Sequence, residues 1–481
     1  MTATASARTG AAAPVRIPAV RYVGLLLGVL VGTYGFNVVT ATMPQLASEL
    51  RVGPVGQETV VAAYGIPFAA LLILGGRLGD RFGRRALFGI GMGLFALASV
   101  AGVLSPGIEM LVVTRVLQGI GAALCTPQVL GTIQATAAPA DRVRLIALFG
   151  AAGGVGAALG QVLGGVLAGV APFGSGWRAA YAVAAVLALT SVALSRLAPA
   201  SRSPRPAAAD VAGTLQLLFG ILLVVAALTY GPALGRWVTL GVLALGVALL
   251  VVLWFHQDRI ERSGRIPLLP PGVLRLRPLQ LGLVMAALFF AGYGAVLYVA
   301  TRSIETGLRI DPAETGAMLL PFAVVFAGVS AMIGRIQRRL GDAVLPIGLG
   351  LQISGLVIGA VTTALAWGPG LPLVLQPGLV VLGVGQAMVF SPLTQIVVRA
   401  IPDSAAGLSG GMFATVQQLA LALGVIAYGA VETAFGLDAR EGLIAGFAGD
   451  AAAAAVVLVL AGVLAATARA ARRTGGISGR V

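Results

Sequence analysis

Apolar residues fill this chain in long, nearly unbroken runs, and short stretches of arginine, glycine and proline separate them. Runs such as 22–39, 211–229 and 451–467 approach the roughly 20 residues that a helix needs to cross a bilayer. Because lipid offers no partners for backbone polar groups, such runs form helices. The pattern predicts fourteen spans, near residues 21–43, 55–75, 86–104, 108–132, 144–171, 178–197, 211–230, 236–256, 278–301, 314–334, 343–366, 371–397, 405–433 and 449–468.

The composition supports an all-α membrane protein. Of the 481 residues, 58% are hydrophobic and 10% are charged, whereas about a quarter of the residues of a soluble domain are charged. The single Cys125 lies inside an apolar run and His256 is the only histidine. No disulfide framework, metal site or cofactor is therefore expected. The polar segment 1–20 leads into a full-length span, which does not fit a cleaved signal peptide.

All 32 basic residues are arginines, and their distribution tests the span count. With the N-terminus in the cytoplasm, the cytoplasmic segments hold 25 arginines and the outer segments hold six, while Arg115 lies within a span. This bias follows the positive-inside rule. It predicts that both termini are cytoplasmic. It also explains the net charge of +15 without nucleic-acid binding, because the arginines lie in short loops and not in one patch.

One short pattern occurs twice. Residues 76–83 and 334–341 both fit Gly-Arg-[Leu/Ile]-x-x-Arg-x-Gly, 258 residues apart, in loops that follow the second and tenth spans. The repeat predicts two related bundles, a common design in transporters. We expect an N-terminal tail (1–20), a six-helix bundle (21–198), two inserted helices with a linker (199–257), a cytoplasmic loop (258–277), a second six-helix bundle (278–468) and a basic tail (469–481).

Three motifs carry a family resemblance. Gly76–Arg85 lies in the loop after the second span, Arg115–Ala123 in the fourth span, and Gly156–Gly165 in the fifth. With these motifs, the chain resembles the major facilitator superfamily, within it the fourteen-span drug:proton antiporter branch. The resemblance implies two six-helix bundles plus two extra helices, and transport by alternating access.

Two positions depart from that branch. Gln161 stands where the antiporter motif of the family has a proline. The branch usually carries an aspartate in the first span, nine residues before a proline, and counting back from Pro44 places Gly35 there. Since the first span contains no acid, the usual proton-coupling carboxylate is missing. Both departures argue against proton antiport more than against transport.

The resemblance implies that the loop after the second span is a cytoplasmic latch that opens and closes as the bundles rock. Its glycines permit tight turns and close helix approach, and an aspartate is stabilised near helix N-termini. The alternative is a basic loop that only sets the topology. The predicted gating residues are Gly76, Asp80, Arg81, Gly83, Arg84 and Arg85.

Arg115 and Glu58 are the proton-coupling candidates. Arg115 lies about 10 Å inside its span, and charged residues within a membrane are functional candidates by default. Glu58 lies about one turn inside the second span, and the two are hypothesised to face each other in one conformation. The alternatives are that Arg115 extends to the interface and that Glu58 is a solvated interfacial charge. Glu432 is a second, weaker candidate for the acid.

Small and polar residues within the spans predict packing and a cavity. Glycines every fourth residue give a smooth helix face that permits close helix crossing. A dinucleotide loop is excluded there, because no strand or soluble βαβ unit is present. The predicted antiporter-like helix contains Gly156, Gly160, Gln161, Gly164 and Gly165. The predicted cavity residues, each of which alone could be a helix–helix contact, are Tyr34, Asn37, Gln118, Gln128, Tyr293, Tyr298, Gln386 and Gln417.

The sequence thus predicts a secondary transporter that exports small amphipathic organic compounds, driven by protons. The alternatives are a metabolite, lipid or antibiotic-specific carrier, or a uniporter. A membrane enzyme or receptor is disfavoured, because no catalytic constellation or sizeable soluble domain is apparent, and a channel lacks the expected charged ring. The expected partners are a small-molecule substrate, protons and the lipid bilayer, and not nucleic acid. The protein is expected to be a monomer in a bacterial inner membrane.

Overall fold

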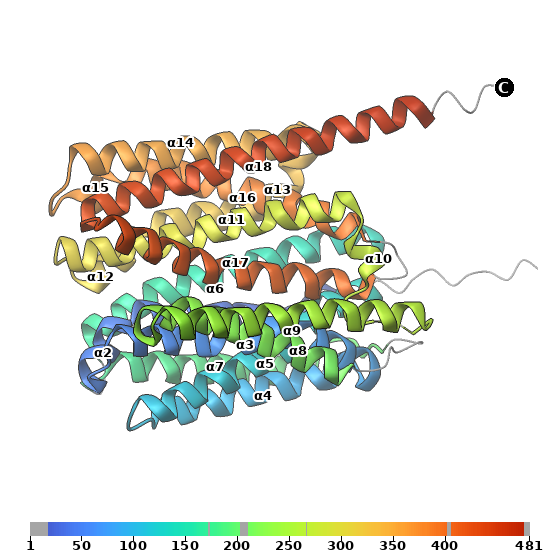
Figure 1. The fold of residues 1–481 in the computed structure, drawn as a ribbon, viewed down its shortest axis with the longest axis horizontal. Coiled ribbons are helices and arrows are strands. Elements are labelled where there is room, and N and C mark those ends of the chain that lie inside the picture. Colours follow the sequence, from blue (N-terminus) through green and yellow to red (C-terminus); the bar gives the residue numbers. More distant parts are fainter. Residues whose placement is uncertain (1–17, 172–173, 203–209, 266, 402–405, 476–481) are drawn as a thin grey trace, which may run out of the picture.

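The computed structural model describes residues 18–171, 174–202, 210–265, 267–401 and 406–475, almost all of them helical. Figure 1 shows two bundles side by side, one coloured blue to teal and the other yellow to red, with a green helix pair against the first. The helices run roughly parallel to the long axis, as they would across a bilayer. The protein is an all-α membrane protein.

The first bundle contains six long helices. They are α1 (Val23–Ala41), α3 (Pro54–Phe82), α4 (Arg84–Val103), α5 (Ile108–Thr136), α6 (Pro139–Val170) and α7 (Gly176–Ser195). A short 3-10 helix, η1 (Ala19–Tyr22), precedes α1, and α2 (Met43–Leu50) follows it. Large buried aromatic side chains fill the bundle core, among them Tyr34, Phe88, Phe95 and Trp177.

The two inserted helices, α8 (Val211–Leu234) and α9 (Arg236–Arg262), form a hairpin. Gly235 joins them with a φ of 78°, a backbone conformation that favours glycine. Gly220 and Gly246 face each other where the helices cross, so the backbones approach closely. The hairpin packs on α3, and many apolar side chains on α9 are exposed, as expected for a lipid-facing helix.

The second bundle begins after the short helix α10 (Pro271–Leu274), and its long helices pack on one another in the same order as those of the first. Its helices are α11 (Arg277–Arg302), the π-helical turn η3 (Ser303–Gly307), α12 (Pro312–Met318), α13 (Leu320–Leu340), η4 (Gly341–Ala343), α14 (Val344–Leu365), α15 (Leu371–Val374), α16 (Gln376–Arg399), α17 (Ala406–Phe435) and α18 (Ala439–Gly475). Both copies of the repeated pattern end on a glycine with positive φ, Gly83 at 104° and Gly341 at 56°.

The described residues contain thirteen stretches that are long and apolar enough to cross a membrane. One of them, Glu314–Leu365, is 52 residues long and holds both α13 and α14. Taken as two helices, these give the fourteen spans that the sequence predicts. The domain boundaries inferred from the sequence stay predictions.

Several predicted helix boundaries were wrong. The second span was expected to end at residue 75, but α3 continues to Phe82. The tenth span was expected as one helix over 314–334, but the chain breaks at Leu319 and restarts with Pro321 in the first turn of α13. Proline lacks the N–H that a continuous helix would need there. The last span was expected over 449–468, but α18 begins ten residues earlier.

A capping box starts α18. The carboxylate of Asp438 accepts a hydrogen bond from the Glu441 amide at 2.8 Å, and the Glu441 carboxylate accepts one from the Asp438 amide at 3.2 Å. This reciprocal pair is a strong helix start. It moves Asp450 from the predicted helix end into the middle of the span, which becomes important below.

The two bundles meet along α3 and α17 on one side and along α6 with α12 and α13 on the other. The Thr415 hydroxyl of α17 donates to the Ala69 carbonyl of α3 at 3.0 Å. Ile66, Ala70 and Ile73 of α3 join an apolar core that includes Phe413 of α17. The bundles therefore touch through small apolar surfaces with few polar links.

Candidate functional site

Arg115 is fully buried in the first bundle, with 0% of its surface exposed. Its Nη1 donates to the Gly35 carbonyl at 2.8 Å and to Gln118 Oε1 at 3.0 Å, and its Nε donates to the Val60 carbonyl at 3.3 Å. The guanidinium lies 4.5 Å from the centroid of the Tyr64 ring. Arg115 therefore does not extend to the membrane interface, and α1, α3 and α5 meet around its charge.

Gly35, the position of the missing aspartate, supplies a backbone carbonyl to this arginine. The described side chains form no ion pair with Arg115. The side chain of Glu58 lies outside the described residues, so its pairing with Arg115 stays a prediction. Glu432 lies near the C-terminal end of α17 in the second bundle, where it forms an ion pair with Arg302 at 2.6 Å.

The glycine row of α6 packs against α1. A methyl group on Gly156 would lie 2.3 Å from the Leu30 carbonyl oxygen, and one on Gly160 would lie 2.9 Å from the Tyr34 carbonyl oxygen. Gln161 donates to Asn37 Oδ1 at 3.5 Å, and both residues are nearly buried. Predicted residues of the antiporter-like helix and of the cavity thus meet at the α1–α6 contact.

The other end of that row faces the second bundle. A methyl group on Gly316 of α12 would lie 3.1 Å from the Gln161 carbonyl oxygen and 3.5 Å from the Gly165 Cα. Gly164 packs instead on Ala41 of α1. α6 and α12 therefore approach each other closely through glycine and backbone atoms.

An aromatic row, defined here as Tyr293, Phe322, Phe326 and Phe390, lines the second bundle where it meets α6. Neighbouring ring centroids are 6.3–6.4 Å apart. Methyl groups on Gly154 and Gly150 of α6 would lie 2.4 Å from Phe326 and 3.2 Å from Phe390. Further rings, Phe290 and Phe413, extend the cluster into the bundle. Of the row, the sequence predicted Tyr293 alone, although Phe322 and Phe326 have helical i, i+4 spacing.

Other predicted cavity residues lie within the helix packing. The Tyr34 hydroxyl donates to the Ala180 carbonyl at 3.3 Å, Gln118 donates to Ser99 at 2.9 Å, and Gln128 donates to the Gly75 carbonyl at 2.8 Å. All three are at most 1% exposed. This geometry favours the packing alternative for each. Gln386 is 3% exposed, while Tyr298 and Gln417 are half-buried; their substrate contact stays a prediction.

The predicted gating loop is mostly helix, because α3 continues through Phe82 and Gly83 alone turns the chain into α4. Asp80 accepts hydrogen bonds from Arg84 Nη2 at 2.6 Å and Nε at 3.1 Å. Gly83 turns the corner, and Arg81 extends over the Phe82 ring on the surface. A methyl group on Gly76 would lie 3.6 Å from the Cβ of Pro127 in α5.

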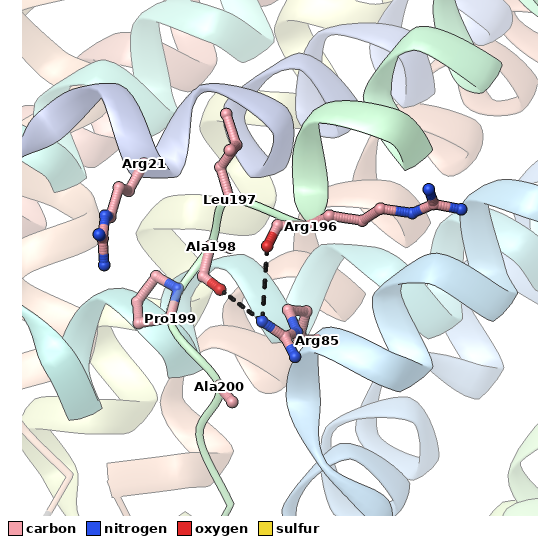
Figure 2. Close-up of a pocket in the computed structure, with 7 residues that line it drawn as sticks. All are labelled: Arg21, Arg85, Arg196, Leu197, Ala198, Pro199 and Ala200. Carbon is pink, nitrogen blue, oxygen red and sulfur yellow. Dashed lines mark hydrogen bonds between the residues drawn. The ribbon is translucent and has the colours of Figure 1, made fainter.

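Arg85 ties this corner to the end of α7. Its Nη1 donates to the carbonyls of Ala198 at 3.2 Å and Arg196 at 3.5 Å, as Figure 2 shows. These groups line an open pocket of about 370 Å³, together with Arg21 and Pro199. Arg85 thus bonds to carbonyls just beyond the last residue of α7 and holds that segment against the start of α4.

The sequence missed a polar network between the gating corner and the inserted hairpin. Arg77, 5% exposed, donates to the Pro267 carbonyl. Gln257 of α9 accepts from the Leu268 amide at 2.6 Å and donates to Asp210 at 2.7 Å. The pattern Asp210-x-x-Gly could have predicted the role of Asp210, because Asp210 caps α8 by accepting a hydrogen bond from the Gly213 amide. The inserted helices are therefore linked, through the segment that follows α9, to the last turns of α3.

In the described ranges, no group of three or more His, Cys, Asp or Glu side chains could hold a metal ion.

The fold has solved counterparts. The human organic anion transporter MFSD10 superposes with a TM-score of 0.64 at 18% identity, covering 92% of this chain and all of that one. The proton:xylose symporter XylE superposes with a TM-score of 0.66 at 19% identity, covering 92% and 94%. At such identities the likeness concerns the fold alone.

Sequence relatives are closer. A probable actinorhodin transporter of Streptomyces coelicolor is 29% identical over 84% of this chain and 71% of its own length. An uncharacterized MFS-type transporter of Mycobacterium tuberculosis is 31% identical over 88% and 72%, and a puromycin resistance protein of Streptomyces alboniger is 30% identical over 85% and 80%. The family model described as Major Facilitator Superfamily matches residues 25–425. The chain belongs to the major facilitator superfamily.

Proposed function

We propose that this protein exports small amphipathic organic compounds, such as drugs or antibiotics, by alternating access and in exchange for protons. The observation that carries the proposal is the aromatic row of the second bundle against the glycines of α6. Apolar walls with few polar groups suit amphipathic molecules, and flat rings stack on aromatic side chains. A compound that entered between Phe326 and Gly154 would contact both bundles at once.

The names of the relatives support this class of substrate. They include transporters or resistance proteins for actinorhodin, puromycin and tetracenomycin C. Each compound appears in the name of one relative and describes that relative alone. For this chain, the shared sequence supports export of an organic compound of comparable chemistry.

The surroundings of the transport path support rocking of the bundles. Contacts between α6 and α12 involve glycine and backbone, which do not interlock. The corner that holds Asp80 and Arg84 belongs to the first bundle, and Arg77 connects it to the segment leading into the second. We assign this corner the role of a cytoplasmic latch, with both termini cytoplasmic, in a monomer in the bacterial inner membrane.

A second candidate function is transport of one metabolite, lipid or antibiotic without proton coupling. Gly35 favours it, because Arg115 is stabilised there by a carbonyl and not by an ionisable acid. A carrier of this kind would equilibrate its substrate across the membrane without concentrating it.

Reconstitution separates the two functions. The purified protein in liposomes with an acidic lumen is offered puromycin or ethidium from outside, with and without the pH gradient. Accumulation that requires the gradient supports proton-driven export. Exchange that ignores the gradient supports the second candidate, and absence of transport for a broad panel of organic compounds contradicts both.

Variants test the aromatic row in the same assay. Phe326→Ala and Phe390→Ala should each lower the affinity for an aromatic compound by roughly three- to tenfold, the equivalent of one ring contact. Phe219→Ala is the matched control, because Phe219 lies on α8 and is 49% exposed. Equal effects of all three variants would argue against the row as the binding surface.

A further inference from the structure

Asp450 is a carboxyl group in the middle of the membrane. It lies on α18, within the 29-residue apolar span Ala439–Thr467, eleven residues or about 16 Å from the start of the helix. Only 2% of its surface is exposed. Acids at such depth are costly and are therefore candidates for function.

Gln352 of α14 is its polar neighbour. Gln352 Nε2 donates to Asp450 Oδ1 at 3.5 Å. In the described part of the chain, the buried atoms Asp450 Oδ2 and Gln352 Oε1 have no hydrogen-bond partner. Two unsatisfied acceptors thus belong to the same pair of side chains.

The described charged groups on the elements around this pair lie toward the ends of their helices. α14 contains no ionisable residue, and α11 carries Arg277 and Arg302 only at its two ends. On α18, the nearest described charges are Arg440 and Glu441, about 13–15 Å along the helix. The remaining titratable groups on the elements around α18 are Tyr293, Tyr298, Glu305, Tyr428 and Glu432. Tyr293 stacks on Phe322, and Glu305 lies in η3. Tyr428 donates to the Gly442 carbonyl, and Glu432 pairs with Arg302.

One proton would satisfy both orphan acceptors. A hydrogen on Asp450 Oδ2 can be donated to Gln352 Oε1 while Gln352 Nε2 continues to donate to Oδ1, which closes an acid–amide pair with two hydrogen bonds. An ionised carboxylate leaves the amide oxygen unsatisfied and has no counter-charge, and both conditions are expensive in a dry interior.

We propose that Asp450 and Gln352 form a proton-binding site. The proton comes from water and forms an O–H bond at Asp450 Oδ2, and the same bond breaks when the proton returns to water. This inference deepens the proposed function, and its part in transport depends on proton-driven export. It supplies a carboxyl group to a chain whose first span has none.

Gly292 links this site to the aromatic row. A methyl group at Gly292 would lie 1.9 Å from Asp450 Oδ1, so the carboxyl group rests directly on the backbone of α11. The next residue, Tyr293, begins the aromatic row. A change in the charge of Asp450 therefore acts on the same short segment of α11 that contacts the proposed substrate surface.

Infrared titration of the purified, full-length protein tests the site without any substrate. Wild type should show a protonated-carboxyl band that titrates with pH and is absent from Asp450→Asn. Glu109→Gln is the control, because Glu109 is an exposed carboxyl at the start of α5, and this variant should keep the band.

A band that persists in Asp450→Asn overturns the proposal. A wild-type band that changes with Na⁺ at constant pH, relative to choline, also overturns it in favour of a metal-cation site.

A second variant keeps the test valid if Asp450→Asn does not fold. Gln352→Met has a similar volume but no amide, so it should retain the band at a shifted frequency; an unshifted band contradicts the acid–amide pair. In liposomes, Asp450→Asn should lose gradient-driven accumulation of ethidium while retaining exchange without a gradient. If wild type moves no compound, the proposed function fails, whereas the infrared result still decides whether Asp450 binds a proton.

Discussion

Arg115 donates from Nη1 to the backbone carbonyl oxygen of Gly35 at 2.8 Å. The resemblance to the drug:proton antiporter branch places an aspartate at this position of the first helix. Here the buried guanidinium uses carbonyls of α1 and α3, an amide of α5 and the face of Tyr64. The arginine thus connects three helices of the first bundle, a role that does not require it to exchange a proton.

Arg115→Lys should reduce transport at least about tenfold, because an ammonium group is a single point of donation whereas the guanidinium reaches several carbonyls in fixed directions. One lost charge-assisted hydrogen bond costs roughly 1.5–3 kcal/mol. Transport and the thermal unfolding midpoint of the purified protein are the measurements.

Arg236→Lys is the control for this substitution, since Arg236 lies exposed at the start of α9 over the Trp237 ring. It should leave both quantities unchanged. If Arg115→Lys behaves like Arg236→Lys, the fixed geometry of the guanidinium is not needed.

The sequence predicted the architecture well because lipid imposes strong rules. Apolar runs and arginine positions are local signals, so the fourteen spans and the repeated corner at Gly83 and Gly341 could be recognised from them. Arg115 could be recognised as unusual for the same reason. Its partners could not, because they come from three helices whose rotation the sequence does not specify.

The phenylalanines of the aromatic row and Asp450 were missed for different reasons. Phe322 and Phe390 come from two helices that are far apart in the chain from each other and from Tyr293, and each alone is an ordinary apolar residue. Asp450 was missed because Arg440, Glu441 and several glycines lower the hydropathy before it, which delayed the predicted start of the last span. The capping box shows that this polar stretch is already helix.

Gly156→Ala should destabilise the protein by about 1–3 kcal/mol, the usual cost of overpacking. The added methyl group would lie 2.3 Å from the Leu30 carbonyl oxygen and 2.2 Å from Thr33 Oγ1, so α1 and α6 would have to separate. Thermal unfolding in detergent measures the effect. Gly93→Ala is the control, because nothing lies within 4 Å of its Cβ position, and a loss of equal size there would contradict the packing argument.

Asp210 makes the stability of the inserted hairpin depend on pH. Burial raises the pKa of Asp210, but hydrogen bonds from Gln257, the Gly213 amide and His256 together outweigh it, so the pKa is lowered below its ordinary value. A carboxyl whose folded pKa is lowered stabilises the fold above its unfolded pKa, and this contribution disappears as the pH falls through the folded pKa. Asp210→Asn should therefore lower the unfolding midpoint at neutral pH and converge with wild type in acid. A difference that stays constant with pH would exclude this linkage.

The ion pair at the gating corner should affect the rate of transport more than binding. Asp80 and Arg84 are 26% and 13% exposed, so water only partly screens their 2.6 Å contact. Asp80→Asn removes the charge and keeps the shape, and if the pair is made in one state of the cycle and broken in another, its loss changes the barrier between them. The expected result is a change in turnover of up to about fivefold, the equivalent of about 1 kcal/mol, with equilibrium binding of ethidium unchanged.

Asp342→Asn is the matched control, because Asp342 is an exposed acid directly after Gly341 at the corresponding corner of the second bundle. Equal turnover of wild type and both variants would leave the corner as a topology signal alone, since arginines there orient the chain whether or not the pair forms.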